Sequence, residues 1–134
     1  MDDWDIIEEV GGGAAMESLM REFYDRLFDD MIIGFLFDHS DKEALIASQI
    51  DYIHAHLGSR QGRYEGPSIR EAHRDLPILV GQFDRRHQIL GEVLQEFEVP
   101  ERVRQAWLNL DQAMREMVIN QGAQRRDEIL SGGD

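Results

Sequence analysis

Cysteine and threonine are absent from this sequence of 134 residues, and Lys42 is its single lysine. Without cysteine, the chain can form no disulfide, no thiolate zinc site, no iron–sulfur cluster and no thiol nucleophile. A nucleotide-binding phosphate loop needs a glycine-rich turn followed by Lys-Ser or Lys-Thr, and the sequence has no such motif. These absences argue against nucleotide-phosphate chemistry and are compatible with a reducing compartment.

Long hydrophobic runs are absent as well. The longest apolar stretch, Met31 to Phe37, is far shorter than the ~20 residues that a membrane-spanning helix needs. The segment Met1 to Asp5 has neither the basic region nor the apolar stretch of a secretion signal. We therefore expect a cytoplasmic protein with no membrane partner.

Negative charge dominates the composition. The chain has 27 acidic and 14 basic residues, which give a formal net charge of −13 and a pI near 4.7. Such a surface repels phosphate backbones, so we expect no nucleic-acid partner. A solvated acidic surface that favours solubility is the simplest interpretation of this charge.

The length and composition predict one domain. At this size a chain buries about two-thirds of its unfolded surface, so one hydrophobic core can form without disulfides. Hydrophobic residues make up 42% of the sequence, which is enough for that core. We expect a single domain over residues 1–134, with its core between about residues 6 and 121 and a frayed C-terminal tail from about residue 129.

The residue types and their spacing predict an all-α fold. Helix-favouring Leu, Ala, Glu, Gln, Met and Arg dominate, and glycines break the chain at residues 11–13 and between Gly58 and Gly66. Apolar residues recur at intervals of three and four, as on one face of a helix. Ser40 and Glu43 have the spacing of a capping box at a helix start. The expected helices cover residues 14–29, 41–57, 67–73, 83–97 and 101–121.

The histidines are the first candidates for metal chemistry. His54 and His56 are two residues apart, so on a helix they point about 200° apart and cannot share one ion. Asp51 and His54 have metal-ligand spacing, but carboxylate di-iron bundles need two Glu-x-x-His motifs, and only this weak copy exists. His73 differs because it follows a glycine-rich loop and precedes a proline-containing turn.

From about Ile6 to Val118 the chain resembles the truncated haemoglobins, and most closely their group I branch. These are small globins in which a two-over-two helical sandwich surrounds haem. Each motif is weak alone, but their order and separation are specific. The matching landmarks are Gly11-Gly12, Phe23-Tyr24, Phe37, Gln49, Gly58, Tyr64-Glu65-Gly66, Ile69-Arg70-Glu71-Ala72-His73, Phe83-Asp84 and Val99-Pro100-Glu101.

The resemblance implies haem b as the cofactor and His73 as the ligand of its iron. A neutral imidazole on one side leaves the sixth iron position free for a diatomic gas. On the other side, Tyr24 matches the distal tyrosine of the family, whose hydroxyl would donate to bound dioxygen. Gln49 matches a second distal polar position, which explains an amide on an otherwise apolar stripe.

The remaining matched positions would form the cofactor pocket. By resemblance, Phe37 packs flat against the porphyrin. Leu45 stands where larger globins often have a distal histidine, and a leucine cannot ligate iron. Two arginines, Arg63 and Arg70, could reach the haem propionates, although solvated arginines are the simpler interpretation. The residues expected around the cofactor are Phe37, Leu45, Ile53, Arg70, Ile78 and Phe83.

The run Arg85-Arg86-His87 departs from the family, whose members are usually apolar there. If the register holds, Arg86 faces the distal side. A buried arginine costs several kcal/mol unless it is paired. Arg86 must therefore reach solvent, meet a carboxylate or a propionate, or belong to a shifted helix.

The leading interpretation is a haem protein that reversibly binds dioxygen, nitric oxide or carbon monoxide, and the resemblance extends this to oxygen transport or nitric oxide dioxygenation. The second activity makes the protein an enzyme that needs an external electron donor, since the chain has no room for a flavin domain. Two alternatives are a haem-free helical interaction module, whose aromatic and methionine stripes simply fill a core, and a haem-based gas sensor.

Overall fold

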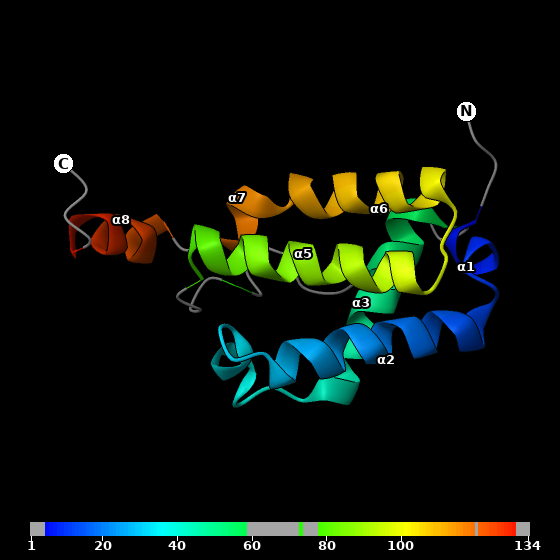
Figure 1. Ribbon diagram of the computed structural model, residues 1–134, viewed down its shortest axis with the longest axis horizontal. Coiled ribbons are helices and arrows are strands. Elements are labelled where there is room, and N and C mark those ends of the chain that lie inside the picture. Colours follow the sequence, from blue (N-terminus) through cyan, green and yellow to red (C-terminus); the bar gives the residue numbers. More distant parts are fainter. Residues whose placement is uncertain (1–4, 59–72, 74–77, 120, 131–134) are drawn as a thin grey trace.

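The computed structural model describes residues 5–58, 73, 78–119 and 121–130 (Figure 1). Every regular element within these residues is a helix, which confirms the all-α prediction. The elements are α1 (Ile6–Glu9), α2 (Gly13–Asp29), the short 3-10 helix η1 (Gly34–Phe37), α3 (Lys42–Leu57), α5 (Val80–Glu96), α6 (Glu101–Ala113), α7 (Arg115–Val118) and α8 (Gln121–Leu130).

The long helices form two packed pairs. Helix α2 contacts α3, and α5 contacts α6. Helix α2 also lies along α5, while α3 passes behind them in Figure 1, so the two pairs share one core. This arrangement is the two-over-two sandwich expected from the sequence. Among the described residues, no helix is both long and apolar enough to cross a membrane.

Helix α2 follows the predicted pattern closely. Its buried residues recur at helical spacing and supply one wall of the core: Met16, Leu19, Met20, Phe23, Tyr24 and Leu27. The preceding Gly11 and Gly12 have φ values of 110° and 106°, which side chains rarely adopt. The glycines therefore end α1 and let α2 begin at Gly13.

Helix α3 starts one residue later than expected. Asp41 has extended backbone and its side chain accepts from the Ala44 amide at 3.2 Å, so Asp41 is the N-cap. The predicted capping box of Ser40 and Glu43 is wrong. Glu43 instead accepts two hydrogen bonds from Arg21 of α2, and Ser40 lies on the wall of an internal cavity.

The predicted last helix over residues 101–121 is wrong in its extent. Helix α6 ends at Ala113, Met114 breaks the regular backbone, and the short α7 follows. A further helix, α8, was not predicted, although its residues Gln121–Leu130 have good helix propensity. It extends beyond the end of the bundle in Figure 1. Its last residues, Ile129 and Leu130, are exposed, and the rest of the predicted frayed tail lies outside the described residues.

Candidate functional site

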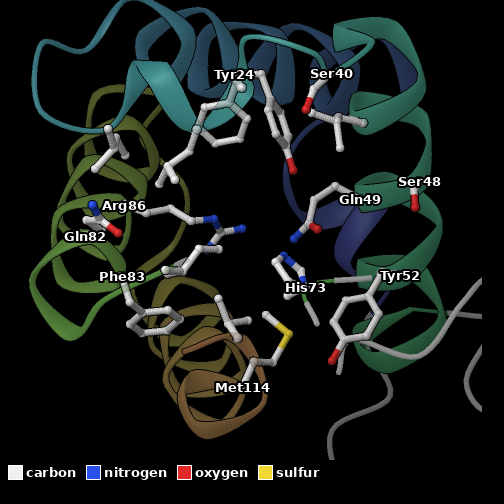
Figure 2. Close-up of a pocket in the computed structure, with 16 residues that line it drawn as sticks. Tyr24, Ser40, Ser48, Gln49, Tyr52, His73, Gln82, Phe83, Arg86 and Met114 are labelled. Atoms are coloured by element: carbon white, nitrogen blue, oxygen red, sulfur yellow. The ribbon is translucent and has the colours of Figure 1, made fainter. Parts of the chain in front are cut away.

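A cavity lies between the two helix pairs and encloses about 240 Å³ of space that water can enter. Residues from α2, η1, α3, α5 and the junction of α6 and α7 surround it (Figure 2). Its lining is Tyr24, Ile33, Leu36, Phe37, Ser40, Leu45, Ser48, Gln49, Tyr52, His73, Ile78, Gln82, Phe83, Arg86, Met114 and Val118.

Most of the predicted site residues meet in this cavity. Figure 2 shows the side chains of Tyr24, Gln49 and His73 directed toward its interior, although they come from distant parts of the sequence. The apolar residues expected around the cofactor also line the cavity: Phe37, Leu45, Ile78 and Phe83. Ile53 lies elsewhere, fully buried in the hydrophobic core and absent from the cavity wall. Arg63 and Arg70 lie outside the described residues.

Tyr24 adds a hydroxyl group to the cavity wall, beside Arg86. Its side chain is almost completely buried, and its ring meets that of Phe23 edge to face at 5.2 Å between centroids. Burial raises the pKa of the Tyr24 hydroxyl, while the positive charge and hydrogen bond of Arg86 oppose that rise. The hydroxyl therefore stays protonated at neutral pH and can donate a hydrogen bond.

His73 is half-buried and its backbone is helical, as the sequence predicted, while the segments on either side lie outside the described residues. Its ring lines the cavity. The two histidines of α3, which the sequence indicated could not share one ion, make separate contacts: His54 Nε2 lies 3.6 Å from Asp5 Oδ2, and His56 Nδ1 is 2.9 Å from the Tyr52 carbonyl oxygen. Within the described ranges, no group of three or more acidic or histidine side chains is placed to hold a metal ion.

Arg86 adds a charged group to the cavity wall. Its Nη1 donates to Asp111 Oδ1 at 2.5 Å, and its guanidinium lies 5.2 Å from the centroid of the Phe23 ring. On the other side of the carboxylate, Asp111 Oδ2 is 2.8 Å from His87 Nδ1. Of the alternatives left open by the sequence, contact with a carboxylate is confirmed.

The charges of this buried group depend on one another. Burial would lower the pKa of the Arg86 guanidinium, but the charge of Asp111 and the hydrogen bonds with Asp111 and Tyr24 outweigh it, and the pKa is raised. Burial would likewise raise the pKa of Asp111, but Arg86 and His87 hold it below its usual range. Arg86 and Asp111 are therefore a charged pair at neutral pH.

Sequence reasoning missed Asp111, which is 1% exposed. The apolar pattern of the last helix was read through Leu110, yet Leu110 is only partly buried. The buried face of α6 runs instead through Val103, Trp107 and Asp111 to Met114. The four-residue spacing from Val103 to Trp107 and on to Asp111 is a sequence signal that could have placed Asp111 on the buried face of the helix.

An aromatic pair supports the cavity wall near η1. Phe37 stacks on Phe28 with centroids 5.0 Å apart, and Phe37 faces the cavity. The Lys42 ammonium lies 4.9 Å from the Phe28 centroid and donates to Asp25 at 2.8 Å. Helices α2 and α3 are thereby joined beside the cavity wall.

Comparisons with known proteins agree with this architecture. The family described as bacterial-like globin matches residues 5–122 of the chain. A group 1 truncated hemoglobin of Tetrahymena thermophila is 26% identical over 98 residues, covering 73% of this chain and 80% of that protein. The crystal structure of truncated hemoglobin from Tetrahymena pyriformis in its Fe(III) form is similar with a TM-score of 0.77 and 24% identity, covering 88% of this chain and 100% of that one.

A further solved structure has the same fold. The 2/2 hemoglobin of Synechococcus, in the cyanomet state and with covalently attached heme, has a TM-score of 0.75 and 24% identity. The similarity covers 87% of this chain and 98% of that one. These likenesses confirm the two-over-two helical fold and the resemblance seen in the sequence.

Proposed function

This chain belongs to the bacterial-like globin family, and on that basis we propose that it binds haem through His73 and holds a small gaseous ligand near Tyr24 and Gln49. Membership of the truncated globins implies haem-based gas binding. The roles of His73, Tyr24 and Gln49 go beyond family membership and are our proposal. One observation supports them: His73, Tyr24 and Gln49 line the same cavity although they are far apart in sequence.

The chemistry of the cavity suits haem. A ligand of this kind needs apolar walls for the macrocycle and one imidazole for the iron. The wall supplies Phe37, Leu45, Ile78 and Phe83, and His73 supplies the imidazole. Bound haem iron would supply the coordination position at which dioxygen, nitric oxide or carbon monoxide attaches.

Tyr24 and Gln49 would donate hydrogen bonds to the bound gas. The Tyr24 hydroxyl can donate a hydrogen bond, and the Gln49 amide offers two further N–H donors from α3. Donors in a buried site interact more strongly with a polar ligand than they would in water. Tyr24 and Gln49 would thus slow the release of a ligand that gains negative charge when it binds.

Nitric oxide dioxygenation is a further part of the proposal. Conversion of dioxygen and nitric oxide to nitrate consumes one electron, which bound haem would supply and which an external electron donor would then have to replace. Nitric oxide consumption should therefore require a reductase with its reduced cofactor. Gas binding without turnover, in the presence of such a reductase, would identify a carrier or a sensor.

Haem binding through His73 has a direct test. The full-length protein, supplied with hemin, should show a Soret band. His73→Ala should fail to retain haem through gel filtration, because the imidazole–iron bond is lost. His39→Ala is the matched control, since His39 is exposed and does not line the cavity. Equal haem content in His73→Ala and the wild type would contradict the assignment. A wild-type protein that is folded and colourless and does not bind added hemin would instead support a haem-free interaction module.

A further inference from the structure

The cavity wall carries a permanent positive charge in addition to the hydrogen-bonding groups of Tyr24 and Gln49. The Arg86 guanidinium lies on the cavity wall and is directed toward the space between Tyr24 and Gln49 (Figure 2). Its side chain is 19% exposed, so water screens the charge only weakly. A guanidinium in such a place acts on whatever small molecule enters the cavity.

Neighbouring groups fix Arg86 in this position. Asp111 accepts from Nη1, the Phe23 ring lies against the guanidinium, and His87 contacts the second oxygen of Asp111. The carboxylate comes from α6 and the arginine from α5, so the packing of two helices aligns the pair. Arg86 therefore does not need to reorganise before a ligand arrives.

Arg86 keeps hydrogen-bond donors for a ligand. A guanidinium has five N–H donors in a rigid plane. Asp111 uses one of the Nη1 donors, and Tyr24 also interacts with the group. The side of the guanidinium that faces the cavity can therefore donate to a bound molecule while the ion pair with Asp111 persists.

We propose that Arg86 makes the cavity selective for a small monovalent anion, such as azide, nitrite or hydrosulfide, as a ligand of the haem iron. This inference rests on the proposed function, because the iron supplies the bond that holds the ligand. Carbon monoxide stays nearly uncharged when it binds, so it gains little from a fixed positive charge. An anion gains the attraction of the guanidinium and a charge-assisted hydrogen bond, which is roughly twice as strong as a neutral one.

The test compares an anion with a neutral ligand of similar size. Azide is titrated into the ferric haem-bound protein and carbon monoxide into the ferrous form, and the Soret band reports each dissociation constant. The main variant is Arg86→Gln/Asp111→Asn, which removes both charges but keeps polar side chains of similar shape. We expect azide affinity to fall about 10- to 100-fold, the range for a hydrogen bond to a charged group. Carbon monoxide affinity should change by less than about threefold.

Three further measurements make the result specific. Arg86→Leu/Asp111→Leu replaces the ion pair with apolar side chains, a change that proteins with buried ion pairs often tolerate. It should show the same selective loss of azide affinity. Arg85→Leu is the matched control, because the neighbouring Arg85 pairs with Asp30 and does not line the cavity. Its azide affinity should match the wild type. Titrations with nitrite and hydrosulfide then rank the anions.

The outcomes separate this inference from the proposed function. Equal changes of azide and carbon monoxide affinity in the double variants, or no change in either, overturn anion selection by Arg86 but leave haem binding intact. An equal loss of azide affinity in Arg85→Leu also overturns it, since net charge would then explain the effect. A wild-type protein with no Soret band after addition of hemin overturns both proposals.

Discussion

Arg86 and Asp111 face each other between α5 and α6, with Nη1 of the arginine 2.5 Å from Oδ1 of the carboxylate. The pair lies in the interior, where the sequence predicted that an unpaired Arg86 would be energetically costly. The two charges are tolerated in the interior because each has an opposite charge beside it, and because His87 and the Phe23 ring complete the surroundings. The stability of the fold and the chemistry of the cavity therefore depend on the same contact.

Removing one member of this pair should destabilise the protein strongly. Asp111→Ala leaves the Arg86 charge buried without its partner, and such a change costs about 3–5 kcal/mol. Urea unfolding of the haem-bound protein, followed by circular dichroism, measures the free energy of unfolding. Glu43→Ala is the control, because its pair with Arg21 is exposed and should contribute no more than about 1 kcal/mol. A cost below about 1 kcal/mol for Asp111→Ala would show that the pair contributes little.

The Asp111 carboxylate should also make the fold sensitive to acid. Arg86 and His87 hold the pKa of Asp111 below its unfolded value of about 3.9, despite the opposing effect of burial. The stability contributed by this group is thus complete above about pH 4 and is lost as the pH falls toward the folded pKa. The free-energy difference between the wild type and Asp111→Asn should shrink as the pH falls below about 4. A difference that does not vary with pH would disprove this linkage.

Loss of the Tyr24 hydroxyl should speed the release of dioxygen. Tyr24→Phe keeps the ring that packs against Phe23 and removes the donor, so the dissociation rate should rise about tenfold or more. Stopped-flow displacement of dioxygen by carbon monoxide measures this rate. Tyr52→Phe is the control, because Tyr52 lines the same cavity from α3. An unchanged rate in Tyr24→Phe would mean that Gln49 or Arg86 provides the stabilisation.

Gly34 should tolerate no side chain. A Cβ atom there would lie 2.6 Å from the Phe28 carbonyl oxygen, which is backbone and cannot move aside easily. Gly34→Ala should cost about 1–3 kcal/mol, as overpacking typically does. Gly81→Ala in α5 is the matched control, because a Cβ there meets no atom within 4 Å and alanine favours a helix. Thermal unfolding should give a lower Tm for Gly34→Ala and an equal or higher Tm for Gly81→Ala; the opposite order would contradict this account.

The turn after α5 contains a residue in a costly conformation. Glu98 has a φ of 56°, while the amide of Glu98 donates to Gln95 and that of Val99 donates to Leu94. This pattern is the Schellman ending of a helix, in which glycine is favoured. Glu98→Gly should therefore stabilise the protein by about 0.5–1 kcal/mol, whereas Gln95→Gly, within α5 at an exposed position, should destabilise it by a similar amount. Equal effects of the two changes on urea unfolding would refute this reading of the turn.

The sequence predicted the features that depend on local patterns. The apolar spacing from Met16 to Leu27 placed the second helix within one residue, and Pro100 marked the start of α6. The cavity residues Tyr24 and Gln49 were predicted from the family resemblance, which depends on the order and separation of motifs along the sequence.

Features that depend on contacts between distant residues were harder to predict. The cap of α3 depends on whether Ser40 or Asp41 has the extended backbone, and both residue types suit that role. Asp111 is buried because Arg86 approaches from another helix, and Leu110 beside it gave an equally plausible apolar pattern. The break at Met114 has no glycine or proline to mark it.

The position of Lys42 has a practical consequence. Its ammonium lies beside Phe28, whose ring stacks on the cavity residue Phe37. Because no other lysine exists, an amine-reactive fluorophore could label one side chain besides the amino terminus. Energy transfer from that dye to a coloured ligand in the cavity would report filling and emptying in real time, without an engineered cysteine.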